Sequence, residues 1–334
     1  MIGSKWQRGV RLGLPAVGLG ILAFMLARLD RAAMLDQLGR VSGGHLALAS
    51  LIFSANAGLK CARWLRLLRT YDIVLPYREG IFAFFASTFY GLVTIGGVGE
   101  ITRAGVLIAR DVHWSRALVS CLFDRALDVA LLSIIACIAV IHYSLPPTGQ
   151  YLAFAILAGV LLAAVIRGQH IVQWCASSVS SWPFFRRMPN QAERLRLLFE
   201  ATLPCVRPAK LCELVLWTLV GWAGYMGTML ILADGLGIHA SPGSMIATSA
   251  LDGLTVLLPI SFQGVKTRKP MFVLVLGREG VPQEQAVLLA MLGFWVIFAT
   301  AIVIGLLGIA GQALQGPGAG QAPTRSVDDA VKAP

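Results

Sequence analysis

Residues 82–128 decide the fold, and they read FAFFASTFYGLVTIGGVGEITRAGVLIARDVHWSRALVSCLFDRALD. An apolar run enters this stretch and breaks at three glycines: Gly96, Gly97 and Gly99. Two charged residues, Glu100 and Arg103, follow the break before the chain turns apolar again. Irregular backbone at membrane depth is tolerated only where protein or water covers it. The pattern therefore predicts a re-entrant hairpin of two half-helices with its tip near Gly97. An ordinary span followed by a short interfacial helix is the alternative.

The apolar run that ends this stretch carries Asp124, Arg125 and Asp128. The two acids are four residues apart, so they share one face of a helix. Charged side chains inside apolar segments of a membrane protein are costly and usually mark a substrate or ion pathway. We therefore expect these charges, with Glu100 and Arg103, to form one polar site. A self-neutralising cluster that only fixes helix packing is the alternative.

The composition indicates a membrane protein. The 334 residues are 57% hydrophobic and 13% charged, whereas soluble domains carry about 25% charged residues. A bundle of helices satisfies its backbone in lipid, and the chain lacks the ten-residue alternating segments of a barrel. The net charge of +11 fits basic loops at the cytoplasmic face and attraction to anionic lipids, so no nucleic-acid partner is expected. The six cysteines lack metal-ligand spacing, and we expect no metal and no cofactor.

The fold class is predicted to be an all-α polytopic membrane protein. We expect an integral membrane domain over residues 1–311 and a disordered tail over 312–334. An amphipathic helix is expected at the interface over 190–203. Six apolar segments are read as full transmembrane helices: 12–29, 46–59, 118–141, 151–166, 211–232 and 286–311.

A second broken segment repeats the pattern of the first. An apolar run over 244–258 ends in a break that contains Pro259 and Gly264, and a short apolar piece follows over 271–277. The tip of this segment is basic and carries Lys266, Arg268 and Lys269. Two re-entrant broken hairpins in an inverted repeat are a design that transporters use around a site near the midplane.

The loops give an orientation. Segments 60–78 and 167–210 are basic and should be cytoplasmic, whereas 142–150 and 234–243 lack Lys and Arg and should lie outside. With six spans, both termini are then cytoplasmic. Arg63 lies in the first basic segment, where it is read as a cytoplasmic anchor or as part of a headgroup-binding edge.

The sequence resembles the lysylphosphatidylglycerol synthase transmembrane-region family, also called the flippase-like domain family, over residues 10–311. Three motifs carry the resemblance: Arg63-Trp64-x-x-Leu67-Leu68, Gly99-Glu100-x-x-Arg103-Ala104 and Arg125-x-x-Asp128. The second broken segment departs from the family pattern P-x-S-x-G-G-x-G-x-R-E, because Gln263, Lys266 and Lys269 replace two glycines and the glutamate. The family includes the membrane half of bacterial enzymes that aminoacylate phosphatidylglycerol and flip the product outward. The resemblance implies a stand-alone membrane unit without the synthase domain.

We therefore expect a lipid translocator in the bacterial cytoplasmic membrane. Its expected partners are anionic phospholipid or polyprenyl phosphate, and a lipid-synthesis enzyme encoded separately. The chain lacks a Walker A motif and is not expected to be an enzyme. A membrane-embedded headgroup transferase and a non-transporting scaffold of a lipid-synthesis complex are the alternatives. The candidate substrate-binding residues are Arg63, Glu100, Arg103, Asp124, Arg125, Asp128, Lys266, Arg268 and Lys269.

Overall fold

The computed structural model describes residues 38–94, 99–144, 159, 167–178, 189–257 and 265–314, and these residues form helices and no strand. The all-helical prediction is confirmed for this part of the chain. Single-turn 3-10 helices include η1 (Arg69–Tyr71) and η6 (Gly277–Glu279). The labelled helices are α3 (Gly43–Leu68), α4 (Tyr77–Val93), α5 (Thr102–Ile108), α6 (Trp114–His142), α8 (Pro189–Thr202), α9 (Pro208–Gly235), α10 (Pro242–Leu257), α11 (Val265–Leu276) and α12 (Gln283–Leu314).

Within the described ranges, three helices are long and apolar enough to cross a bilayer: α6, α9 and α12. They coincide with the predicted spans at 118–141, 211–232 and 286–311. The predicted span at 12–29 and residues 315–334 of the predicted tail lie outside the described residues, and so does the span at 151–166 apart from residue 159. The prediction of a disordered tail from residue 312 is wrong for residues 312–314, because α12 continues to Leu314. Helix α8 occupies the predicted amphipathic segment and packs against α6. The number of six spans stays a prediction.

Helix α3 is longer than the sequence predicts. We expected a short span over 46–59 and a basic loop over 60–78, but the helix continues to Leu68. The loop prediction is therefore wrong for residues 60–68. The physical reason is that the basic side chains find acidic partners on neighbouring helices: Arg63 on α6 and Arg66 on α9. Apolar residues of the same turns are buried as well, including Trp64 and Leu67.

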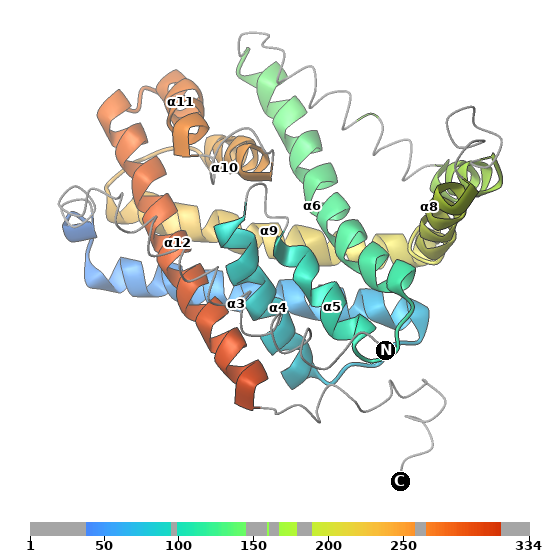
Figure 1. The fold of residues 1–334 in the computed structure, drawn as a ribbon. Coiled ribbons are helices and arrows are strands. Elements are labelled where there is room, and N and C mark those ends of the chain that lie inside the picture. The colour runs from blue at the N-terminus through green and yellow to red at the C-terminus, as the bar shows by residue number, and fades with distance from the viewer. Residues whose placement is uncertain are drawn as a thin grey trace.

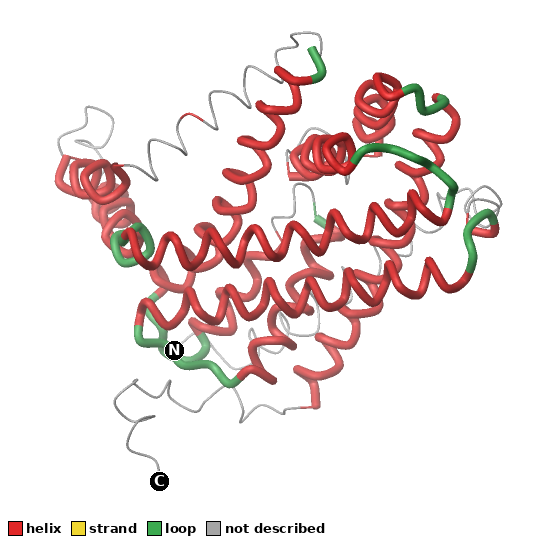
Figure 2. Tube along the Cα trace, turned by 180° about the vertical axis from the view of Figure 1, so that it is seen from behind, coloured by secondary structure: helices red, strands yellow, loops and turns green. Residues whose placement is uncertain are grey.

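Helices α3 and α9 lie side by side over much of their length (Figures 1 and 2). Two glycines of α9 make room for one side chain of α3. A Cβ added at Gly224 would lie 3.1 Å from Cβ of Asn56, and one added at Gly221 would lie 3.4 Å from Asn56 Oδ1. The close approach of the two helices buries the polar side chain of Asn56 against α9.

The two broken segments appear in the structure as helix–break–helix pairs. Helices α4 and α5 form the first pair and lead into α6, whereas α10 and α11 form the second pair and lead into α12. The packing is reciprocal, because α6 contacts α10 and α12 contacts α4. Most of the predicted break residues, Gly96, Gly97, Pro259 and Gly264, lie outside the described residues. The re-entrant course of both pairs and the inverted repeat stay predictions.

Helix α11 begins earlier than expected, at Val265, with Pro270 inside it. Its first turns therefore contain Lys266, Arg268 and Lys269, which the sequence placed in the break.

Helix α12 packs directly on the backbone of α4 through three glycines spaced by three residues. A Cβ added at Gly305 would lie 2.5 Å from Cβ of Phe89. One added at Gly308 would meet the backbone nitrogen of Ala86, and one added at Gly311 would meet the ring of Phe82. A side chain at any of these positions would push the two helices apart.

Candidate functional site

The centre of the site is an arginine held between two acids. Asp124 and Asp128 share one face of α6, as their spacing predicts, and the structure shows that this face is turned toward α3. Arg63 Nε donates to Asp124 Oδ1 at 2.8 Å, and its Nη1 and Nη2 donate to Asp128 Oδ1 and Oδ2 at 2.7 and 3.2 Å. Such charge-assisted pairs with planar geometry are the strong form of the ion pair. The interpretation of Arg63 as a cytoplasmic anchor is therefore wrong.

Helix α9 completes the surroundings of Arg63. Its Thr218 hydroxyl accepts a hydrogen bond from Arg63 Nη1 at 2.9 Å, and its Trp222 Nε1 donates to Asp128 Oδ1 at 3.0 Å. The backbone oxygen of Asp124 accepts from Arg63 Nη2 at 3.1 Å. All three nitrogens of Arg63 are thus engaged within the protein. Its side chain is 1% exposed, so Arg63 holds the two carboxylates in position and is itself covered by the protein.

A second arginine binds Asp124 from the other side. Arg103, on α5, donates from Nη2 to Asp124 Oδ2 at 2.7 Å. Its guanidinium lies over two aromatic rings, 5.2 Å from the centroid of Trp64 and 4.7 Å from that of Phe84. Arginine over an aromatic face gains a cation–π attraction. Asp124 is therefore compensated by two buried cations, and the short helix after the first break is tied to α6.

Glu100 and Arg125 form a more accessible pair. Arg125 Nη2 lies 2.9 Å from Glu100 Oε1, and the side chains keep 25% and 23% of their exposure. The carboxylate reaches Arg125 by crossing α4 at Gly91, where an added Cβ would lie 2.7 Å from Glu100 Cγ. The preceding residue, Gly99, donates its backbone N–H to Thr94 Oγ1 at 2.7 Å, which joins the two sides of the break.

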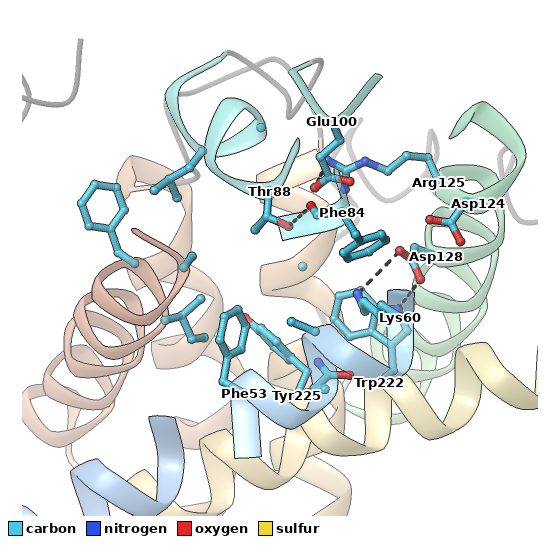
Figure 3. Close-up of a pocket in the computed structure, with 18 of the residues that line it drawn as sticks. Phe53, Lys60, Phe84, Thr88, Glu100, Asp124, Arg125, Asp128, Trp222 and Tyr225 are labelled. Carbon is cyan, nitrogen blue, oxygen red and sulfur yellow. Dashed lines mark hydrogen bonds and ion pairs between the residues drawn. The ribbon is translucent and has the colours of Figure 1, made fainter. Parts of the chain in front are cut away.

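These charges border a cavity of about 200 Å³ (Figure 3). Figure 3 shows Lys60 and Trp222 on one side of it, beneath Asp128, with Glu100 directed toward Arg125 on another. The rest of the wall is mostly apolar. It comes from α3, α4, α9, α10 and α12, through Phe53, Asn56, Ala57, Phe84, Thr88, Gly91, Leu92, Tyr225, Gly253, Phe294, Ile297, Phe298 and Ala301.

The structure brings together one part of the predicted set. Four predicted residues form one buried ion network, Arg63, Arg103, Asp124 and Asp128, and two form a separate ion pair, Glu100 and Arg125. The four that line the cavity are Glu100, Asp124, Arg125 and Asp128, whereas the two arginines of the network lie behind its wall. Lys269 is exposed and does not line the cavity. Lys266 and Arg268 are placed only as part of the α11 backbone.

Several polar residues in or next to the site were not predicted from the sequence. Lys60 Nζ lies 3.6 Å from Asp128 Oδ2 and 4.4 Å from the centroid of the Trp222 ring. Asp252, buried on α10, accepts a hydrogen bond from Tyr225 at 2.9 Å. A signal was present, because two helices carry polar residues at i, i+4 and i+7, the spacing of one helix face. They are Asn56, Lys60 and Arg63 on α3, and Thr218, Trp222 and Tyr225 on α9.

Comparison with known proteins decides the family. A family model described as the lysylphosphatidylglycerol synthase TM region matches residues 12–305. The chain belongs to this family. The match covers most of the chain, including every helix from α3 to α11, and confirms the resemblance seen in the motifs.

Membership of the lysylphosphatidylglycerol synthase TM family indicates a membrane protein with a function connected to membrane lipids. No curated protein and no solved structure gave a match.

Proposed function

We propose that this chain is a lipid translocator that shelters a polar headgroup in the cavity while the hydrocarbon tails stay in lipid. The observation that carries the proposal is the composition of the cavity wall. Charged groups from α3, α6 and the first break line one part, and apolar side chains from α12 line another. A ligand with both a polar and an apolar part matches such a wall, and a small soluble ion does not.

The surroundings of the two buried acids argue against the transferase alternative. A base or metal ligand needs a carboxylate whose lone pairs are available. Asp124 is bound by Arg63 and Arg103, and Asp128 by Arg63, with Lys60 close by. We therefore propose that these acids hold Arg63 and Arg103 in position, and that the chain transports the lipid without modifying it chemically. A separately encoded lipid-synthesis enzyme would supply the substrate at the bacterial cytoplasmic membrane.

The packing between the repeats supports a mechanism of alternating access. The Glu100–Arg125 pair joins the first broken pair to α6, and α12 closes the opposite wall. Movement of α4 and α12 relative to α3, α6 and α9, with α5 held on α6 by the Arg103–Asp124 pair, would open the cavity to one side of the membrane and then to the other.

The test is translocation in proteoliposomes that contain the full-length protein. Fluorescent phosphatidylglycerol and a polyprenyl-phosphate analogue are followed by an impermeant quencher outside. We expect protein-dependent loss of signal for at least one lipid. Glu100→Gln should slow it by about tenfold, which corresponds to about 1.4 kcal/mol in the barrier.

Glu213→Gln is the matched control. This glutamate also pairs with an arginine, Arg66, at 2.9 Å, but it does not line the cavity. It should leave the rate within about twofold, a change well below 1.4 kcal/mol. Absence of lipid movement by the folded wild type would reject the translocator and favour a transferase or scaffold.

A further inference from the structure

Arg103 is a buried cation that uses only part of its hydrogen-bonding capacity. Its Nη2 donates to Asp124 Oδ2 at 2.7 Å. Its other two nitrogens, Nε and Nη1, have no hydrogen-bond partner among the described residues, although the Cys121 thiol, a weak acceptor, lies nearby. Buried polar groups are nearly always hydrogen-bonded, because an unsatisfied donor costs free energy. The two unsatisfied nitrogens of Arg103 therefore need an explanation.

Two aromatic rings cover the guanidinium of Arg103. The centroids of the Trp64 and Phe84 rings lie 5.2 and 4.7 Å from Arg103 Cζ. Both faces attract the cation, but they do not supply the oxygen acceptors that match the planar fork of a guanidinium. Arg103 is thus stabilised where it lies and keeps donors that an oxygen could still occupy.

The two rings differ in how firmly they are held. Trp64 is 0% exposed, and its Nε1 donates to Ser120 Oγ on α6 at 3.4 Å. Phe84 has no polar group that could anchor its ring, and it lines the cavity. Figure 3 shows this ring among the side chains that surround the cavity. Phe84 can therefore move into the volume of the cavity, whereas Trp64 is fixed between α3 and α6.

Phe84 and Asp124 separate Arg103 from the cavity. Both residues line the cavity and contact the guanidinium, whereas the Arg103 side chain is 0% exposed. Withdrawal of the Phe84 ring would open Arg103 to the cavity on that side and leave its bond to Asp124 in place. A ligand oxygen that entered there would meet donors that no carboxylate occupies.

The ring and the guanidinium lie on helices that the proposed mechanism moves apart. Phe84 lies on α4, which packs on α12 through the three glycines, whereas Arg103 lies on α5, which Asp124 ties to α6. Movement of α4 relative to α6 would withdraw the ring from the guanidinium. The cavity would then bind an anion more tightly in one conformation than in the other. A ligand can shift a conformational equilibrium only through such a difference.

From these contacts we infer that Arg103 is a phosphate-binding group that the Phe84 ring covers in this conformation and uncovers when α4 moves. The movement of α4 rests on the proposed function, whereas the unsatisfied donors and their cover rest on the contacts of Arg103 itself. Phosphate is the matching ligand chemistry, since its oxygens accept the parallel N–H bonds of a guanidinium. A glycerophospholipid and a polyprenyl phosphate both supply this group.

The test is titration calorimetry of the full-length protein in a neutral detergent, with Phe84→Ala as the variant that lacks the cover. Dihexanoyl phosphatidylglycerol and farnesyl phosphate are the phosphate probes, and dihexanoyl glycerol is the probe without phosphate. We expect Phe84→Ala to bind one or both phosphate probes about tenfold more tightly than the wild type does, the worth of one charge-assisted hydrogen bond. Binding of dihexanoyl glycerol should not become tighter.

Phe298→Ala is the matched control. Phe298 is buried and lines the same cavity, but it lies on α12. Its truncation enlarges the cavity by the same side chain and leaves the Phe84 ring over Arg103, so it should not tighten binding of either phosphate probe. Adding Arg103→Gln to Phe84→Ala should remove the gain in affinity, and Asp124 keeps its ion pair with Arg63 in that double variant.

Phe84→Leu serves if the alanine variant does not fold, as judged by size-exclusion chromatography. Leucine keeps most of the apolar volume but not the flat ring, so it should give a smaller gain in the same direction. The inference would be overturned by an equal gain in Phe298→Ala or by a gain that survives Arg103→Gln. The absence of any gain in a folded Phe84 variant would overturn it as well.

Failure of this inference is separable from failure of the proposed function. Translocation by the wild type in proteoliposomes, without the gain in Phe84→Ala, would leave the translocator standing and remove the cover. A gain that depends on Arg103, without translocation by the wild type, would support the phosphate-binding group and reject the translocator.

Discussion

Replacing Arg63 by methionine should destabilise the protein more than any substitution of a surface charge. The change keeps a long side chain but removes five N–H donors. Among the described residues, it leaves Asp124 paired with Arg103, and Asp128 with the longer contact to Lys60 and the Trp222 N–H. Removing one partner of a buried ion pair costs about 3–5 kcal/mol, because the remaining charge is uncompensated.

The magnitude is tested against Arg66→Met on the same helix. Arg66 and Glu213 are 43% and 32% exposed, and ion pairs of that exposure contribute about 0–1 kcal/mol. One kcal/mol shifts the melting temperature by about 2–4 °C for chains of roughly 150–250 residues. We expect Arg63→Met to lower the Tm in detergent by on the order of 10 °C, and Arg66→Met by at most about 4 °C.

The assay is thermal unfolding followed by intrinsic fluorescence at one scan rate, with size-exclusion chromatography to confirm folded material. A compensated variant sharpens the test. Adding Asp128→Asn to Arg63→Met should recover part of the lost stability, since the amide carries no charge that needs a partner and Asp124 keeps its ion pair with Arg103. Similar Tm shifts for the two methionine variants would refute the reasoning.

Three further predictions follow from packing and ionisation. Gly308→Ala should lower the Tm by an amount equivalent to about 1–3 kcal/mol, because its Cβ has no room; Gly105→Ala, with no atom within 4 Å of its Cβ, is the control in the same melting assay. Glu279 is exposed. The partial loss of hydration of its carboxylate alone would raise its pKa, but hydrogen bonds from neighbouring serines hold that pKa below its ordinary value of 4.5. Its stabilisation is therefore complete above about pH 4.5 and is lost at lower pH, so the Tm difference between wild type and Glu279→Gln should shrink on acidification. Burial raises the pKa of the Cys205 thiol to about 11, so at pH 7.5 a maleimide should label a variant that retains only the exposed Cys212 and not one that retains only Cys205.

The part of the site on α6 could be predicted because its signal is local. Asp124 and Asp128 lie in one apolar run, and their spacing alone places them on one face. The cost of burying them required cations nearby. Periodicity gives a face but not the neighbouring helix, so the sequence left open which cation they meet. The answer, Arg63, lies 61 residues before Asp124 in the chain.

Lys60 was missed because the residues around it fit two interpretations, a basic cytoplasmic loop and a continued helix with a polar face. A cluster of basic residues after an apolar run is typical of a cytoplasmic loop, and that interpretation ended the helix too early. The stripe formed by Asn56, Lys60 and Arg63 becomes visible only once the helix is continued to Leu68. Likewise, the basic tip of the second segment was included among the candidate substrate-binding residues, but Lys269 is exposed outside the cavity.

The glycine contact between α12 and α4 has a consequence for biosynthesis. During translation α4 is made about 200 residues before α12, and until then the face of α4 that receives the three glycines lacks this contact. Phe294, Ile297, Phe298 and Ala301 are also missing from the cavity wall until α12 is added. The polar centre around Arg63 can assemble early from α3, α6 and α9, whereas the enclosure around it is finished last. A nascent chain that stalls before residue 283 should therefore form its ion pairs beside a cavity that is still open. Membrane quality control would then recognise the exposed charges of that open cavity.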